Sequence, residues 1–163
     1  SQSDRKMGIP GEDLERSHAA TEFVAWYNGH PDFSKHTFDL SAERVAVIGI
    51  GNVAVDVARI LCRTEQELLE SDIADYALEA LSKSNVKEVI MLGRRGPAQA
   101  AFTNPEVKEL RELAGADFCV LPDEVDLDAL SQSDLDSGSD KSVIRKVELL
   151  QQTMIPLLKF LEI

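Results

Sequence analysis

The fold class follows from residues 45–62, which read VAVIGIGNVAVDVARILC. Residues 45–48 are an apolar, mostly β-branched run that is typical of a strand. Two glycines follow at once, and residues 52–62 then carry Val53, Val57 and Leu61 at intervals of four, which predicts a helix with one apolar face. A strand, a glycine-rich turn and a helix in this order are the elements of a nucleotide-binding βα unit.

The turn itself, residues 49–54, has the pattern G-x-G-x-x-A. We expect Gly49 to allow a tight turn, Gly51 to let the backbone approach a pyrophosphate, and Ala54 to keep helix and strand close together. The first N–H groups of the helix and its dipole would then face the phosphates. An ordinary glycine-rich turn can carry the same letters, so the prediction depends on the flanking strand and helix.

The next strand indicates which dinucleotide is bound. Residues 88–93 form an apolar run of the kind expected for a parallel strand covered on both faces, and Arg94 and Arg95 follow it. A site for NAD would place an acid here, whereas a site for NADP places arginine near the 2′-phosphate, which a guanidinium can bind bidentately. The pair therefore predicts NADP(H), although arginines can also serve surface solubility alone.

The remaining pattern supports an α/β fold. Further helices are expected at 17–27 and at roughly 64–84, the latter with Ser71-Asp72 as a cap. Another should run from Asn104, as N-cap with Pro105 first in the helix, to Gly115. A last helix is expected around 143–150, before Pro156, and a strand at 117–121. Strands and helices that alternate with short connections predict a Rossmann-like parallel sheet with helices on both faces.

The length of 163 residues fits one such domain. Residues 1–40 are rich in turn-forming residues and are expected to be a hinge and connecting arm, and residues 41–163 the NADP(H)-binding domain. Seven acids and no Lys or Arg lie within 122–140, which predicts a flexible, solvated acidic loop there.

Composition and residue spacing argue against nucleic-acid-binding, membrane-spanning and metal-binding proteins. A net charge of −12 and a pI near 4.6 argue against a nucleic-acid surface. The apolar runs are far too short to cross a membrane. Cys62 and Cys119 have no C-x-x-C partner and are expected to be buried free thiols in a reducing cytoplasm, and no pattern of metal ligands is present.

Three acids are candidates for a functional role. Asp56 follows Asn52 by one turn and so shares the helix face that looks toward a bound cofactor, although an acid there is often merely solvated. Glu106 and Glu109 lie in the first turns of the helix from Asn104, where they favour the positive end of its dipole without any ligand.

Four segments in the same order closely resemble the adrenodoxin-reductase-type ferredoxin–NADP reductases. They are residues 9–14, IPGEDL; 23–31, FVAWYNGHP; 51–59, GNVAVDVAR; and 93–103, GRRGPAQAAFT. The resemblance runs from about Asp4 to Leu121 and is poor beyond.

The resemblance implies a two-domain flavoprotein, in which FAD takes a hydride from NADPH and passes electrons singly to a ferredoxin. It places Asn52 and Val53 in the pyrophosphate turn and Arg94 and Arg95 at the 2′-phosphate. It assigns Glu106 to the NADP site, and Asp56 and Glu109 to the surroundings of the nicotinamide and the domain cleft. No residue is thereby identified as catalytic with certainty.

The chain also departs from the family. The position of Ile50 usually holds a polar residue in the family, and no second glycine motif for FAD is present. We therefore interpret the chain as the NADP domain alone, which should bind NADPH without turnover because the FAD domain of the same chain is missing. Since ferredoxins are acidic, their main docking face is expected on that FAD domain.

Two alternatives stay open at this point. One is the NADPH domain of a related flavoprotein such as the small subunit of glutamate synthase, and residues 26–30 favour the ferredoxin reductases over it. The other is a non-catalytic interaction domain with a vestigial pocket.

Overall fold

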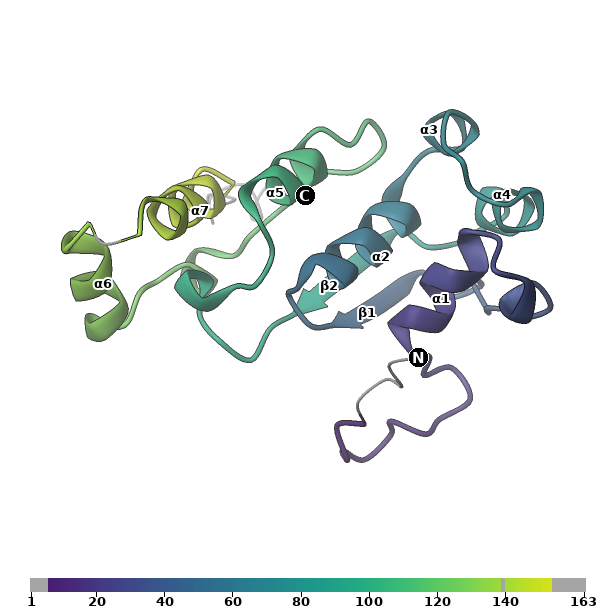
Figure 1. Ribbon diagram of the computed structural model, residues 1–163, viewed down its shortest axis with the longest axis horizontal. Coiled ribbons are helices and arrows are strands. Elements are labelled where there is room, and N and C mark those ends of the chain that lie inside the picture. Colours follow the sequence, from purple (N-terminus) through teal and green to yellow (C-terminus); the bar gives the residue numbers. More distant parts are fainter. Residues whose placement is uncertain (1–5, 139, 154–163) are drawn as a thin grey trace, which may run out of the picture. The chain divides into compact units, whose positions relative to one another are not determined.

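The computed structural model describes residues 6–138 and 140–153 (Figure 1). Its strands are β1 (Arg44–Ile48) and β2 (Glu88–Leu92). Its helices are α1 (Ala20–Tyr27), α2 (Asn52–Cys62), α3 (Glu65–Leu69), α4 (Asp75–Ser82), α5 (Asn104–Arg111), α6 (Ala129–Asp136) and α7 (Lys141–Gln151), with 3-10 turns η1 (Pro31–Phe33), η2 (Pro97–Gln99) and η3 (Pro122–Glu124). The α/β class expected from the sequence is thus confirmed.

The chain divides into two compact units. The first comprises Ser1–Val47 with Asp56–Ile90, and the second comprises Ile48–Val55 with Met91–Ile163. Elements β1, β2 and α2 each continue from one unit into the other. The glycine motif and the arginine pair both belong to the second unit.

Strands β1 and β2 pair in parallel, and both arrows point the same way in Figure 1. Strand β1, β2 and helix α2 begin and end within a residue of the predicted bounds. These predictions succeed because β-branched runs and an apolar stripe of period four are strong local signals.

The expectation that β2 is covered on both faces is wrong for the described residues. Side chains alternate along each strand, so that Val47 is buried whereas Ile48 is 54% exposed. In β2, Ile90 and Leu92 are exposed at 39% and 49%, and they alternate with the half-buried Val89 and Met91. One face therefore carries the packing, and the apolar run reflects strand propensity as much as burial.

Helix α1 begins at Ala20, three residues later than predicted. Ser17 belongs to the preceding turn, because its N–H donates to Leu14 O at 2.8 Å. Helix α1 supplies Phe23, Trp26 and Tyr27 to a buried aromatic cluster of the first unit.

The extra helix expected at roughly 64–84 is two helices, α3 and α4. Thr64 and Glu67 form a capping box that starts α3, and the Ser71 hydroxyl donates to Leu68 O at 2.6 Å at its end. Ser71 is therefore not the cap of the next helix, as the sequence had suggested. Helix α4 instead follows Ala74, whose N–H donates to Tyr27 O at 2.8 Å.

In the second unit, the predicted N-cap of α5 is wrong by one residue. Thr103 is the N-cap, and its N–H and hydroxyl both donate to the Glu106 carboxylate at 2.5 Å. Asn104 is the first helical residue, and its amide donates across to Ser142 O of α7 at 3.1 Å.

The strand predicted at 117–121 does not form. Its backbone makes a single bridge at Val120, whose N–H donates to Thr153 O at 3.4 Å. The residue that accepts this bond lies just after α7 and not in β2, so the segment does not extend the sheet. Phe118 and Val120 still pack against the core of the second unit, and this accounts for their apolar pattern.

The acidic stretch at 122–140 is not a continuous loop. It contains η3 and helix α6, which Asp128 caps by accepting from the N–H groups of Leu130 and Ser131. Acids in such a stretch can start helices as well as solvate loops, because carboxylates are good N-caps. Helix α7 confirms the helical stretch predicted around 143–150, whereas Pro156 lies outside the described residues.

Both described cysteines are free thiols, but their burial differs from the prediction. Cys62 is half-buried, whereas Cys119 is exposed, because the strand that was expected to bury it is absent. Burial raises the pKa of both thiols, and at Cys119 the nearby Asp117 adds to this rise.

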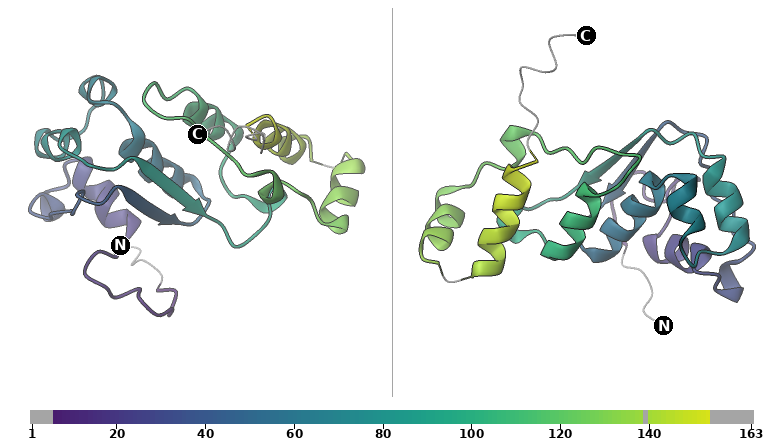
Figure 2. Two further views of the ribbon diagram at one scale, coloured as in Figure 1. Left: turned by 180° about the vertical axis from the view of Figure 1, so that it is seen from behind. Right: turned by 90° about the horizontal axis from the view of Figure 1, so that it is seen from above.

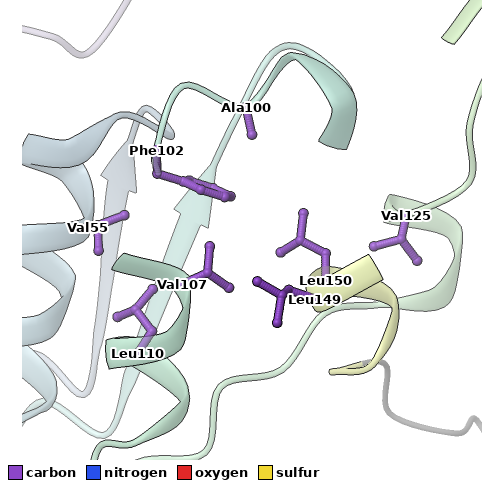
Figure 3. Close-up of a cluster of buried hydrophobic side chains, with 8 residues drawn as sticks. All are labelled: Val55, Ala100, Phe102, Val107, Leu110, Val125, Leu149 and Leu150. Atoms are coloured by element: carbon purple, nitrogen blue, oxygen red, sulfur yellow. The ribbon is translucent and has the colours of Figure 1, made fainter. Parts of the chain in front are cut away.

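The core of the second unit gathers side chains from five segments (Figure 3). It consists of Val55, Ala100, Phe102, Val107, Leu110, Val125, Leu149 and Leu150. Helices α5 and α7 lie side by side, as Figure 2 also shows. Together they contribute four of these eight residues. Because Val55 belongs to α2 and Phe102 follows η2, this core joins the glycine turn to the segment after β2.

We expect Leu149→Ala to lower the free energy of unfolding by about 2–5 kcal/mol, because it leaves a cavity at a side chain that is 2% exposed. Urea unfolding followed by circular dichroism would measure the loss. Leu130→Ala, at a side chain 80% exposed, is the matched control and should change stability little. Equal effects of the two substitutions would contradict this description of the core.

Candidate phosphate-binding turn and arginine loop

The turn between β1 and α2 depends on a glycine at its first position. Gly49 has φ +130°, a conformation that side chains other than hydrogen rarely adopt. Its N–H donates to Leu92 O at 2.8 Å, which extends the pairing of the strands by one bond. The turn is thus fixed to the end of β2 before α2 begins.

The space in front of α2 is open at the second glycine. A Cβ built on Gly51 would meet no heavy atom within 4 Å, and the neighbouring Asn52 and Val53 are exposed. The first N–H groups of a helix have no acceptor within the helix, so this end of α2 can donate to an anion. Ala54, in contrast, is buried, and its methyl lies 3.8 Å from a Cβ built on Gly49. These features fit a pyrophosphate.

Arg94 and Arg95 lie in a bend directly after β2, and both are exposed. Among the residues that the structure describes, no ion pair or side-chain hydrogen bond engages either guanidinium. Two exposed cations that follow the strand bonded to the glycine turn suit a ligand with separated phosphates. We call residues 93–100 the arginine loop.

Ile50 joins the turn to both ends of the arginine loop, a role that the motif did not predict. Three of its side-chain atoms lie 2.5–3.0 Å from the point where a Cβ on Gly93 would be. Its carbonyl accepts hydrogen bonds from the N–H groups of Ala101 and Phe102, at 3.0 and 3.1 Å. The signal available in the sequence was a bulky apolar side chain between the two glycines of the motif.

Glu106 has a structural role that the sequence did not reveal. Its carboxylate is held by Thr103 in the capping box of α5, so local folding alone accounts for this acid. The prediction that it contributes to a cofactor site is not tested by this geometry. Glu109 is exposed one turn later on the same helix.

Asp56 forms an ion pair with Arg59, at 2.5 Å, in the first unit. Both side chains are partly buried, at 38% and 22% exposure. Burial of Tyr27 raises the pKa of its hydroxyl, and the Asp56 charge adds to this rise, whereas Arg59 and Arg63 oppose it. A local ion pair within α2 therefore accounts for Asp56, and its role near a nicotinamide stays a prediction.

Lys146 of α7 is a buried cation that the sequence analysis overlooked. It is 8% exposed, its ammonium donates to Ala100 O at 2.5 Å, and it lies 5.6 Å from the centre of the Phe102 ring. Burial lowers the pKa of Lys146 from its ordinary 10.5, while the carboxylates of Asp140 and Glu106 act in the opposite direction. Its position beside Val147 on an apolar helical face was the available signal.

Several known proteins are similar to this chain. NADPH-ferredoxin reductase FprA of Mycobacterium tuberculosis is 54% identical over 125 residues, 77% of this chain and 27% of the relative. NADPH:adrenodoxin oxidoreductase, mitochondrial, of Arabidopsis thaliana is 55% identical over 115 residues, 70% of this chain and 23% of the relative. The resemblance seen in the sequence is confirmed.

The structure matches as well as the sequence does. A solved structure of Mycobacterium tuberculosis FprA in complex with NADPH aligns with a TM-score of 0.85 and 47% identity, over 93% of this chain and 33% of the FprA chain. This chain therefore spans 23–33% of the length of these relatives. No profile of a known protein family matches it.

Residues 6–138 and 140–153 contain no group of three or more His, Cys, Asp or Glu that could hold a metal ion. Every helix in the same ranges is too short or too polar to cross a membrane.

Replacing Lys146 tests its contribution to the arginine loop. We expect Lys146→Met to lower the free energy of unfolding at pH 7 by about 1–3 kcal/mol, because the buried Ala100 carbonyl loses its donor. Urea unfolding would measure this, with Lys141→Met, at an exposed residue of the same helix, as control.

The lowered pKa of Lys146 predicts that the stability difference between the unmodified chain and Lys146→Met depends on pH. Between the lowered pKa of folded Lys146 and 10.5, the unfolded chain binds a proton at this amine that the folded chain does not. Stability contributed by this group therefore rises as pH rises through that window. The stability of the unmodified chain relative to Lys146→Met should grow toward pH 10.5, and a constant or falling difference would contradict the assignment.

Proposed function

We propose that this chain is the NADPH-binding part of a flavin-dependent ferredoxin–NADP reductase. The observation that carries the proposal is the exposed Arg94 and Arg95, which have no ion-pair partner within residues 6–138 and 140–153. They lie just beyond the hydrogen bond that fixes the glycine turn to the end of β2. The similarity to a reductase solved in complex with NADPH supports it. When bound, NADPH would supply a hydride to FAD, and two electrons would leave singly to ferredoxin.

The residues of this chain would bind and orient the nucleotide. The first N–H groups of α2, at Asn52 and Val53, would hold the pyrophosphate, with Gly49, Gly51 and Ala54 shaping the turn. Arg94 and Arg95 would hold the 2′-phosphate by charge-assisted hydrogen bonds. Hydride transfer itself needs no acid or base from the protein, so the contribution of these residues is position and charge.

Other parts of the assignment extend beyond these two anion sites. We place Glu106 at the edge of the NADP site, and Asp56 and Glu109 closer to the nicotinamide, on the resemblance to the family. The flavin would be held by another domain of the same protein, and a ferredoxin would be the partner of the whole enzyme. Free thiols at Cys62 and Cys119 support a reducing compartment such as the cytoplasm.

Nucleotide preference tests the proposal. Arg94→Ala should weaken NADPH binding about 10- to 100-fold and leave NADH nearly unchanged, because one charge-assisted contact to the 2′-phosphate is lost. Fluorescence titration with both nucleotides at low salt would measure the two dissociation constants. Arg111→Ala, at an exposed residue of α5, is the control and should affect neither.

Two results would count against the proposal. An equal loss of affinity for both nucleotides would show that Arg94 does not contact the 2′-phosphate. Absence of saturable NADPH binding by the unmodified chain would favour the non-catalytic interaction domain.

A further inference from the structure

Ile50 has contacts that go beyond those of a spacer between two glycines. Its side chain covers Gly93, the first residue of the arginine loop, with Cδ1, Cγ1 and Cγ2 at 2.5, 2.9 and 3.0 Å from a Cβ built there. Its carbonyl accepts from Ala101 and Phe102, just after the loop ends. One residue of the phosphate turn therefore holds the arginine loop at both ends.

Neighbouring contacts reinforce the two attachments differently. At the near end, the Gly49 N–H bonds Leu92 O at 2.8 Å. At the far end, the Lys146 ammonium holds Ala100 O at 2.5 Å, next to the N–H that Ile50 binds. The hydrogen bonds of Gly49 and of the Ile50 carbonyl use backbone groups, which any residue at position 50 would keep. The contact with Gly93 is the one that the Ile50 side chain makes. The near end of the loop is thus the end that depends on which residue stands at position 50.

The ligand explains why this attachment matters. In a 2′-phosphorylated dinucleotide the ribose joins the pyrophosphate to the 2′-phosphate, so the separation of the two anionic groups is limited by covalent geometry. A protein that binds both groups must hold its two sites at a matching separation, and affinity falls when that separation fluctuates. A nucleotide without the 2′-phosphate does not make this demand.

We propose that Ile50 is a positioning residue for selectivity toward the 2′-phosphate, acting through its contact with Gly93. The inference rests on the proposed function and deepens it. Ile50 does not touch the 2′-phosphate. It fixes where Arg94 and Arg95 leave β2 relative to the turn that holds the pyrophosphate.

The test compares NADPH and NADH binding by the 163-residue chain and its variants, by fluorescence titration at low salt. Ile50→Ala removes the contact with Gly93 and keeps the backbone bonds. We expect it to weaken NADPH about three- to tenfold and to leave NADH within about twofold. Ile50→Val keeps both Cγ atoms and should retain the selectivity. Ile144→Ala, at a partly buried residue of α7, is the control for deleting the same atoms elsewhere.

A double substitution makes the contact itself measurable. Gly93→Ala places a methyl where the Ile50 side chain lies, so it should lose the same selectivity as Ile50→Ala. In Ile50→Ala combined with Gly93→Ala the methyl occupies the space that Ile50 vacates, and at least part of the NADPH preference should return. Thermal melts by circular dichroism identify any variant that does not fold. If one single variant unfolds, the other decides the result.

The outcomes separate this inference from the proposed function. If the unmodified chain prefers NADPH and Ile50→Ala keeps that preference, or loses both nucleotides equally, the positioning role of Ile50 is overturned while the proposed function stands. Failure of the double variant to regain any preference also overturns it. If the unmodified chain binds neither nucleotide, the proposed function fails and this inference fails with it.

Discussion

The left-handed backbone of Gly49 determines how β1, β2, α2 and the core of the second unit are connected. Because φ at this residue is +130°, the chain can leave β1, bond to the end of β2 and enter α2 within three residues. The Ile50 carbonyl is then presented to Ala101 and Phe102, and Val55 reaches the core where Phe102, Val107 and Leu149 meet. A different turn would move the start of α2, the arginine loop and the core together.

Local patterns in the sequence predicted the elements around this turn. Strand β1, helix α2 and strand β2 were correct because each is specified by propensity and period over five or more residues. Helix starts were less predictable. Thr103, Asn104 and Ser71 are all acceptable N-caps, so the residue type alone does not decide which of them caps a helix; Thr103 forms the capping box with Glu106, whereas the Ser71 hydroxyl bonds back to Leu68. The strand expected at 117–121 failed for another reason, since a strand requires a partner that local sequence does not specify.

The candidate site was predictable only in part. Gly49, Gly51, Arg94 and Arg95 stand out because each residue type has a distinct chemical property at its position. Ile50, Gly93 and Lys146 act through packing and through backbone atoms far away in sequence, which composition and spacing do not encode. The chain as a whole carries a net charge of −12, which repels an anionic ligand at long range. Salt screens the repulsion that the remaining acids exert on an anionic ligand over distances beyond about 8 Å.

The capping box of α5 ties folding to any cofactor role of Glu106. The same carboxylate oxygen accepts both hydrogen bonds from Thr103, and the next residue, Val107, is fully buried in the core. Truncating Glu106 would therefore loosen the start of α5 and disturb that packing, and the damage would resemble loss of a ligand contact. Glutamine can accept the same bonds without the charge, so only this isosteric exchange distinguishes an acid that recognises a nucleotide from one that begins a helix.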